Sequence, residues 1–129
     1  MKQKIAHVAL VVKDYDEAIK FYTEKLDFQV LEDTRLSEDK RWILIAPTGA
    51  KECSILLAKA ANDGQMATIG NQTGGRVFLF LHTDNFNRDY QNLRQHEIKI
   101  VREPVIESYG TVAVFEDLYG NLWDLIEPS

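Results

Sequence analysis

Residues 5–26 read IAHVALVVKDYDEAIKFYTEKL, and this stretch decides the fold. Apart from His7, its first eight residues are apolar and rich in β-branched side chains, which predicts a strand. The polar residues 13–16 follow and can cap a helix. From residue 15 onward apolar side chains recur every three or four positions, which is typical of a helix with one buried face. The stretch therefore predicts a strand that leads directly into an amphipathic helix.

The rest of the chain continues and then repeats this order of elements. Further strands are predicted at residues 28–31, 41–46 and 53–58. The second half then predicts a strand at 77–81, a helix that starts at Thr83 and Asp84, and strands at 98–101, 111–116 and 122–126. An offset of 70 residues places Asp14 on Asp84 and Phe28 on Ile98, which indicates an internal duplication.

The duplication predicts an α+β fold in which two βαβββ modules form a curved open barrel with helices on the outside. We expect one domain over residues 1–129, with the first module at about 4–60, a linker at about 61–75 and the second module at about 76–128. The concave side of such a barrel is a natural pocket for a ligand.

Composition limits the classes of function. The chain of 129 residues is 45% hydrophobic and 27% charged, as in ordinary globular proteins. Its net charge of −5 argues against a nucleic-acid partner, and its short apolar runs argue against a membrane partner or a secretory signal. The single cysteine, Cys53, indicates a reducing compartment. We expect a cytoplasmic protein whose partner is a small molecule.

Two segments carry a likeness to a known family. The first contains His7 and Asp14 in the opening strand and turn, and the second is FEDLYGNLWDLIE at residues 115–127. Together they resemble the vicinal oxygen chelate superfamily, which includes glyoxalase I, bleomycin-resistance proteins and extradiol dioxygenases. The resemblance covers nearly the whole chain. It implies a homodimer and, in the enzymes of the family, a divalent metal ion that binds two neighbouring oxygen atoms of the substrate.

The resemblance places two of the four family metal ligands on residues that can bind metal, His7 and Asp124. The other two positions fall on Leu56 and Phe78, or on Val77 if the strict repeat offset is used. None of these three side chains can coordinate a metal ion. The four-ligand site is therefore predicted to be incomplete.

His7 and Asp124 have two interpretations each. His7 is either a ligand or general base, or a hydrogen-bonded interior histidine. Asp124 needs a partner if it is buried, and His7 is the simplest one. Such a pair acts either as a catalytic base with its orienting group or as a structural remnant.

The remaining candidate residues line the expected pocket. Period-two alternation sends Phe78, Phe80 and His82 to one side of a strand, although His82 also fits a strand end at the surface. Aromatic side chains for a flat or apolar ligand are expected from Trp42, Phe78, Phe80 and Phe115, and core packing explains the same residues. Rim charges are expected from Arg41, Arg76 and Glu107, which also fit a solvated surface.

These observations leave three hypotheses for the function. The first is a protein without a cofactor that binds, isomerises or sequesters an aromatic or oxygenated metabolite in the barrel. The second is a divalent-metal-dependent lyase or dioxygenase that uses His7 and Asp124. The third is a structural or interaction protein. The apolar residues at two ligand positions favour the first hypothesis.

Overall fold

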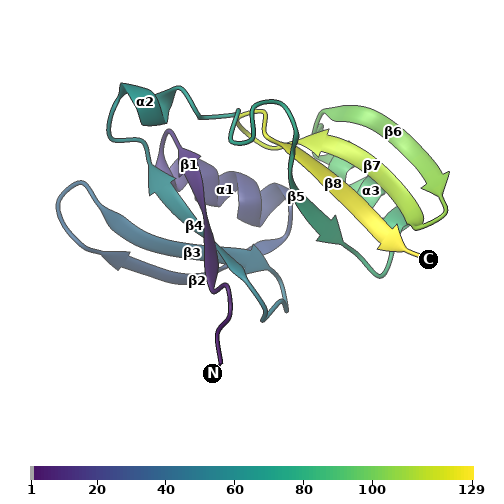
Figure 1. Ribbon diagram of the computed structural model, residues 1–129, viewed down its shortest axis with the longest axis horizontal. Coiled ribbons are helices and arrows are strands. Elements are labelled where there is room, and N and C mark those ends of the chain that lie inside the picture. Colours follow the sequence, from purple (N-terminus) through teal and green to yellow (C-terminus); the bar gives the residue numbers. More distant parts are fainter. Residues whose placement is uncertain (1) are drawn as a thin grey trace. The chain divides into compact units, whose positions relative to one another are not determined.

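The computed structural model describes residues 2–129 and divides the chain into two compact units, Met1–Ile69 and Gly70–Ser129 (Figure 1). Each unit contains a strand, a helix and three further strands, and unit 1 ends with an additional short helix. In each sheet the first strand lies at an edge and pairs in parallel with the last strand, whereas the other pairs are antiparallel. The predicted α+β fold with two βαβββ modules is confirmed.

Unit 1 has the strand order β1-β4-β3-β2. Its elements are β1 (His7–Val12), α1 (Tyr15–Lys25), β2 (Phe28–Arg35), β3 (Arg41–Pro47), β4 (Ser54–Lys59) and the short α2 (Asp63–Met66). The helical turn α2 lies within the segment that we expected to be a linker.

Helix α1 covers one face of the sheet of unit 1 and leaves the other face without a helix (Figure 1). The Asp14 side chain caps the helix by accepting a hydrogen bond of 2.8 Å from the backbone N–H of Glu17. On β1, Leu10 and Val12 are fully buried, whereas His7 and Ala9 are exposed. Because side chains alternate along a strand, His7 belongs to the helix-free face.

Arg41 joins α1 to the sheet. Its guanidinium group donates to Asp16 at 2.9 Å and to Asp33 at 2.7 Å, and it lies 5.4 Å from the centre of the Tyr15 ring. The two carboxylates raise the pKa of Arg41 further above its already high value. The donors of Arg41 are therefore already used by Asp16 on the helix and Asp33 on β2, and its place at a pocket rim stays a prediction.

Unit 2 has the strand order β5-β8-β7-β6. Its elements are β5 (Val77–His82), α3 (Phe86–Gln95), β6 (Ile100–Glu107), β7 (Gly110–Glu116) and β8 (Leu122–Pro128).

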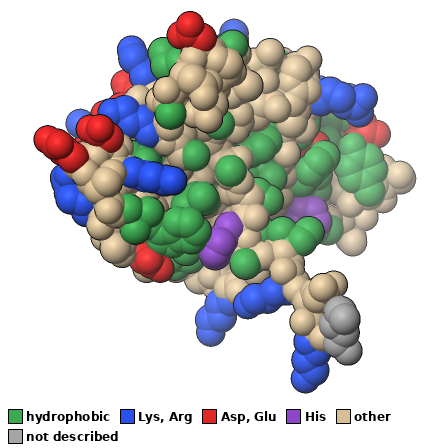
Figure 2. Space-filling model, turned by 60° about the vertical axis from the view of Figure 1, so that its left-hand side comes forward, with side chains coloured by type: hydrophobic (Ala, Val, Ile, Leu, Met, Phe, Trp, Pro, Cys, Tyr) green, Lys and Arg blue, Asp and Glu red, His purple; other side chains and the backbone are tan. Residues whose placement is uncertain are grey.

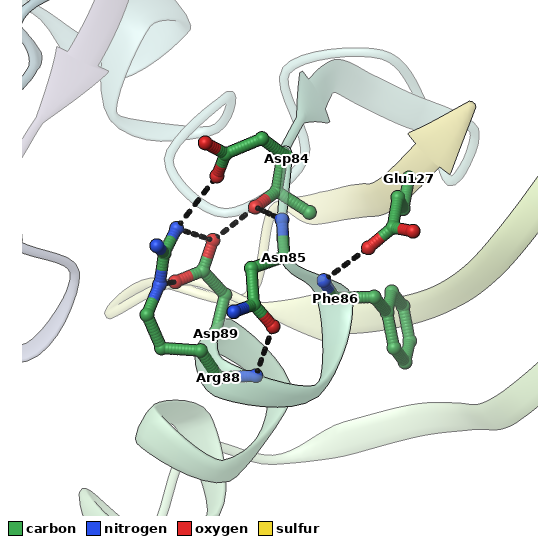
Figure 3. A network of polar contacts seen from close by, with 7 residues as sticks. Asp84, Asn85, Phe86, Arg88, Asp89 and Glu127 are labelled. Atoms are coloured by element: carbon green, nitrogen blue, oxygen red, sulfur yellow. Dashed lines mark hydrogen bonds and ion pairs between the residues drawn. The ribbon is translucent and has the colours of Figure 1, made fainter.

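The start of α3 lies two residues later than Thr83 and Asp84 predict, because Asn85 is the capping residue (Figure 3). The Asn85 side chain accepts from the backbone N–H of Arg88 at 3.1 Å. The backbone N–H of Phe86 donates to the Glu127 carboxylate on β8 at 2.6 Å. This hydrogen bond links the helix start to the last strand. An acidic side chain is favourable at this place, because the helix dipole puts a partial positive charge at the N-terminus of the helix.

Strand β5 contains a bulge. Val77 pairs with Leu122 and Leu79 pairs with Trp123, so two steps along β5 match one step along β8 and Phe78 is the extra residue. After the bulge, Phe80 pairs with Asp124. The repeat offset of 70 residues gives Val77 as the counterpart of His7, whereas the family spacing gives Phe78. The extra residue in β5 explains this difference of one position.

The turn between β7 and β8 is organised by the buried Asp117. Its carboxylate accepts from the backbone N–H groups of Tyr119, Gly120 and Asn121, from the Asn121 side chain and from the Trp123 indole. The segment before β5 packs on this turn. Gly70 has a φ of +75, and a Cβ atom there would lie 2.0 Å from the carbonyl oxygen of Tyr119.

No helix within residues 2–129 is both long and apolar enough to cross a membrane.

Candidate binding face

Asp124 lies on the helix-free face of unit 2. In the sheet it stands between Phe80 on β5 and Val114 on β7, and Arg102 on β6 follows next in the same row. Its neighbours along β8, Trp123 and Leu125, are 2% and 1% exposed, because they point to the side covered by α3. Side-chain alternation therefore directs Asp124 away from the helix.

The Oδ1 atom of Asp124 is buried and has no hydrogen-bond partner among residues 2–129. Burial raises the pKa of the Asp124 carboxyl above the usual aspartate value, and the positive charge of Arg102 offsets part of this rise. Arg102 does not neutralise Asp124 fully, because its side chain is 60% exposed and lies 3.9 Å from Glu107. Asp124 can therefore accept a hydrogen bond when ionised or donate one when protonated.

Phe80 supplies an aromatic surface next to this carboxyl group. It is 63% exposed, an unusual state for a phenylalanine in the middle of a strand. His82 follows two residues later on the same side of β5 and is also exposed. The predicted common orientation of Phe80 and His82 agrees with this arrangement.

Two other predicted pocket residues of unit 2 lie elsewhere, and the place of Arg76 at a pocket rim stays a prediction. Phe78 is the bulged residue, and its ring makes an edge contact with Trp123 at 6.3 Å, so the predicted alternation fails at this position. Phe115 is fully buried and stacks on Trp123 at 6.0 Å, which places it in the core of unit 2. Arg76 is exposed just before β5, where its carbonyl oxygen accepts from Thr73.

In unit 1, His7 pairs with a residue that the sequence did not single out. Its Nδ1 atom lies 2.6 Å from the hydroxyl oxygen of Ser54, which stands opposite His7 on β4. The predicted pair of His7 with Asp124 would join unit 1 to unit 2 and stays a prediction. The edge of the Trp42 ring also contacts the imidazole, with 6.0 Å between ring centres. Trp42 therefore lies on the helix-free face of unit 1, as His7 does. Figure 2 shows histidine side chains beside hydrophobic ones at the surface.

The side chains present do not fit the metal site that the resemblance implies. Leu56 stands beside Ala9 and Leu44 in the sheet of unit 1, and these neighbours offer no donor atom. In unit 2 the neighbour of Asp124 on β5 is Phe80. Within the described part of the chain, no three His, Cys, Asp or Glu side chains are grouped so that they could hold a metal ion.

Sequence reasoning missed Ser54 and Arg102. It also did not place Phe80 beside Asp124. Ser54 could have been found from the strand pattern, since it occupies the start of β4 as His7 occupies the start of β1. Arg102 gave no signal, because its position relative to Asp124 depends on bulges in β6.

The comparisons with known proteins agree with this fold. The sequence profile of the Glyoxalase/Bleomycin resistance protein/Dioxygenase superfamily matches residues 4–125. The chain therefore belongs to this superfamily, as its fold indicates. An uncharacterized protein of Shewanella frigidimarina is 59% identical over 128 residues, which cover 98% of this chain and 95% of that protein.

Several solved structures are similar to the whole chain, among them those of UcmS2 and TnmS3. The structure of UcmS2 matches with a TM-score of 0.85 and 33% identity, over 98% of this chain and 99% of that one. The structure of TnmS3, described as an antibiotic binding protein from Streptomyces sp. CB03234, matches with a TM-score of 0.78 and 26% identity, over 99% of this chain and 98% of that one.

Proposed function

We propose that this protein binds a small aromatic molecule carrying a hydrogen-bond donor, on the helix-free face of unit 2, without the help of a metal ion. The observation that carries the proposal is the buried, unpartnered Oδ1 atom of Asp124 next to the exposed ring of Phe80. The similarity to an antibiotic binding protein supports this class of function.

The physical argument starts from the cost of a buried polar atom without a partner. Such an atom loses its hydrogen bonds to water, at a cost of about 1 to 3 kcal/mol. A ligand hydroxyl or amide N–H that reaches Oδ1 of Asp124 recovers this cost. The ligand ring can then lie against Phe80, where aromatic contact adds about 0.5 to 1.5 kcal/mol. The two contacts together select a flat molecule with a donor at its edge.

The experiment compares two probes that differ only in the donor, hydroxynaphthalene and methoxynaphthalene. Binding is measured by amide chemical shifts in NMR titrations. We expect the hydroxyl compound to bind about tenfold more tightly, which corresponds to one hydrogen bond of about 1.4 kcal/mol. The amides that shift should belong to Phe80, Asp124 and their neighbours.

Two variants separate the contribution of the hydrogen bond to Asp124 from that of the contact with the Phe80 ring. Asp124→Leu should abolish the preference for the hydroxyl compound, and Phe80→Ala should weaken both probes equally. The matched control is Asp39→Asn, which alters an exposed carboxylate in the turn before β3. Equal affinities of the parent protein for both probes, or shifts confined to unit 1, would refute the proposal.

The metal-dependent lyase or dioxygenase remains the competing function. Elemental analysis of protein purified without chelator distinguishes the two. We expect clearly less than one equivalent of nickel, zinc, iron or manganese after buffer exchange, because a stable site presents three or more protein ligands in fixed geometry. One retained equivalent would overturn the metal-independent proposal.

A further inference from the structure

A separate pocket lies in unit 1, where the chain enters β1. Its volume is about 140 Å³, and its wall includes His7, Leu31, Ala50 and Ser54 together with two lysines, Lys4 and Lys51. Since one water occupies about 30 Å³ of liquid, the pocket can hold roughly five waters or a small organic molecule. All residues that line this pocket belong to unit 1.

The charge of the pocket is opposite to that of the protein. Lys4 and Lys51 are exposed, and neither has an ion-pair partner in the part of the chain that the structure describes. Glu52 also lines the pocket and keeps its negative charge, although its Oε2 atom accepts from the backbone N–H of Lys51 at 3.2 Å. The lining therefore carries two positive charges and one negative charge, in a chain whose net charge is −5.

The His7 imidazole lines the pocket beside the two lysines. Its Nδ1 atom lies 2.6 Å from the Ser54 hydroxyl, which in turn donates to the carbonyl oxygen of Ala6 at 3.5 Å. The same carbonyl oxygen accepts from the backbone N–H of Ser54 at 3.1 Å. These bonds fix the imidazole ring at the wall of the pocket.

We propose that this pocket binds a small monocarboxylate, with its carboxylate between Lys4 and Lys51 and its short apolar tail against Leu31 and Ala50. Ammonium groups are suitable donors for a carboxylate, and charge-assisted bonds of this kind are the stronger ones. The apolar lining favours an organic acid over an inorganic anion. Leu31 is 48% exposed, so the tail would cover apolar surface that now faces water.

The test is a titration of the full-length protein with sodium propionate, followed by amide chemical shifts. Sodium chloride at equal ionic strength, inorganic phosphate and ethylammonium chloride are the comparison probes. We expect saturable shifts at Cys53 and Ser54 with propionate alone. Equal binding of phosphate or chloride would overturn the choice of a carboxylate, and binding of ethylammonium would overturn the sign of the charge.

Variants test the donors. Lys51→Gln and Lys4→Gln should each weaken propionate binding by about fivefold, the upper range for an exposed ion pair. The matched control is Lys59→Gln, since Lys59 is an exposed lysine at the end of β4 outside the pocket. Unchanged affinity in both pocket variants would refute the proposal. The variant Asp124→Leu should bind propionate normally, so a failure here is distinct from a failure of the aromatic site in unit 2.

Discussion

The Nδ1 atom of His7 lies 2.6 Å from the hydroxyl oxygen of Ser54 and joins the first strand of unit 1 to its last strand. The serine is 6% exposed, whereas the histidine is open to water. In Ser54→Ala, water can therefore replace the lost hydroxyl at the imidazole. We expect a loss of about 1 kcal/mol in the free energy of unfolding, measured with urea.

The control for this bond is Ser37→Ala, since Ser37 is an exposed serine in the turn between β2 and β3. It should change the free energy of unfolding by less than about 0.5 kcal/mol. Equal losses in the two variants would show that the bond between His7 and Ser54 does not stabilise unit 1.

Asp117 should contribute more than any surface carboxylate. In Asp117→Asn, one oxygen becomes an NH₂ group that faces donors, either the three backbone N–H groups or the side chains of Asn121 and Trp123. We expect a loss of about 2 to 3 kcal/mol in thermal or urea unfolding, because buried donors lose their acceptor. Asp39→Asn is the control and should be nearly neutral. A loss below about 0.5 kcal/mol for Asp117→Asn would contradict the role given to this carboxylate.

Gly70 is predicted to be intolerant of a side chain, and Gly74 provides a matched comparison. Both have positive φ, +75 and +68, but a Cβ atom at Gly74 meets nothing within 4 Å. Gly74→Ala should therefore cost only the backbone strain, about 1 kcal/mol. Gly70→Ala should cost more than this, because the turn must move away from the added methyl group. Thermal unfolding of the two variants measures the difference, and equal costs would contradict the close approach to Tyr119.

Asp124 should give the stability of the protein a pH dependence of unusual sign. Burial raises the pKa of this carboxyl in the folded protein, so the folded state holds the proton more tightly than the unfolded chain does. The contribution of Asp124 to stability is therefore present at low pH and decreases as the pH rises from the ordinary aspartate value, 3.8, through the raised one. The variant Asp124→Asn removes this dependence.

The measurement is urea unfolding of the parent and Asp124→Asn at several pH values from acidic to neutral. Other carboxylates affect both proteins alike, so the difference between them isolates Asp124. We expect the variant to gain stability relative to the parent as the pH rises, and then to keep a constant advantage. A difference that changes in the opposite direction would mean that Arg102 outweighs burial.

The elements of this fold could be predicted because burial leaves a periodic trace in the sequence. The helix predicted from residue 15 onward is α1, and its cap, Asp14, is one of the polar residues 13–16 that were expected to cap it. The strand predicted at 28–31 continues to Arg35 as β2, whose last residues are exposed and polar. Their place in the strand depends on ladder hydrogen bonds with β3, and backbone hydrogen bonds leave no pattern in side-chain type.

The site was less predictable than the fold. The family motifs pointed to His7 and Asp124, but their neighbours depend on strand register. Ser54 became the partner of His7 because the two strands pair at their first residues, and Phe80 lies beside Asp124 because of the bulge at Phe78. A register is set by turns and bulges, which side-chain alternation alone does not reveal.

The bulge in β5 also shows how two copies of one repeat can acquire different chemistry. A single extra residue reverses which side chains of a strand face the helix and which face solvent, while the pairing on either side continues. An insertion of this kind exchanges the whole set of side chains offered to a ligand without replacing any of them. Comparison of duplicated units at a constant spacing would therefore misjudge which residues correspond. Single-residue insertions in edge strands are thus an economical route by which the second half of such a protein can diverge from the first.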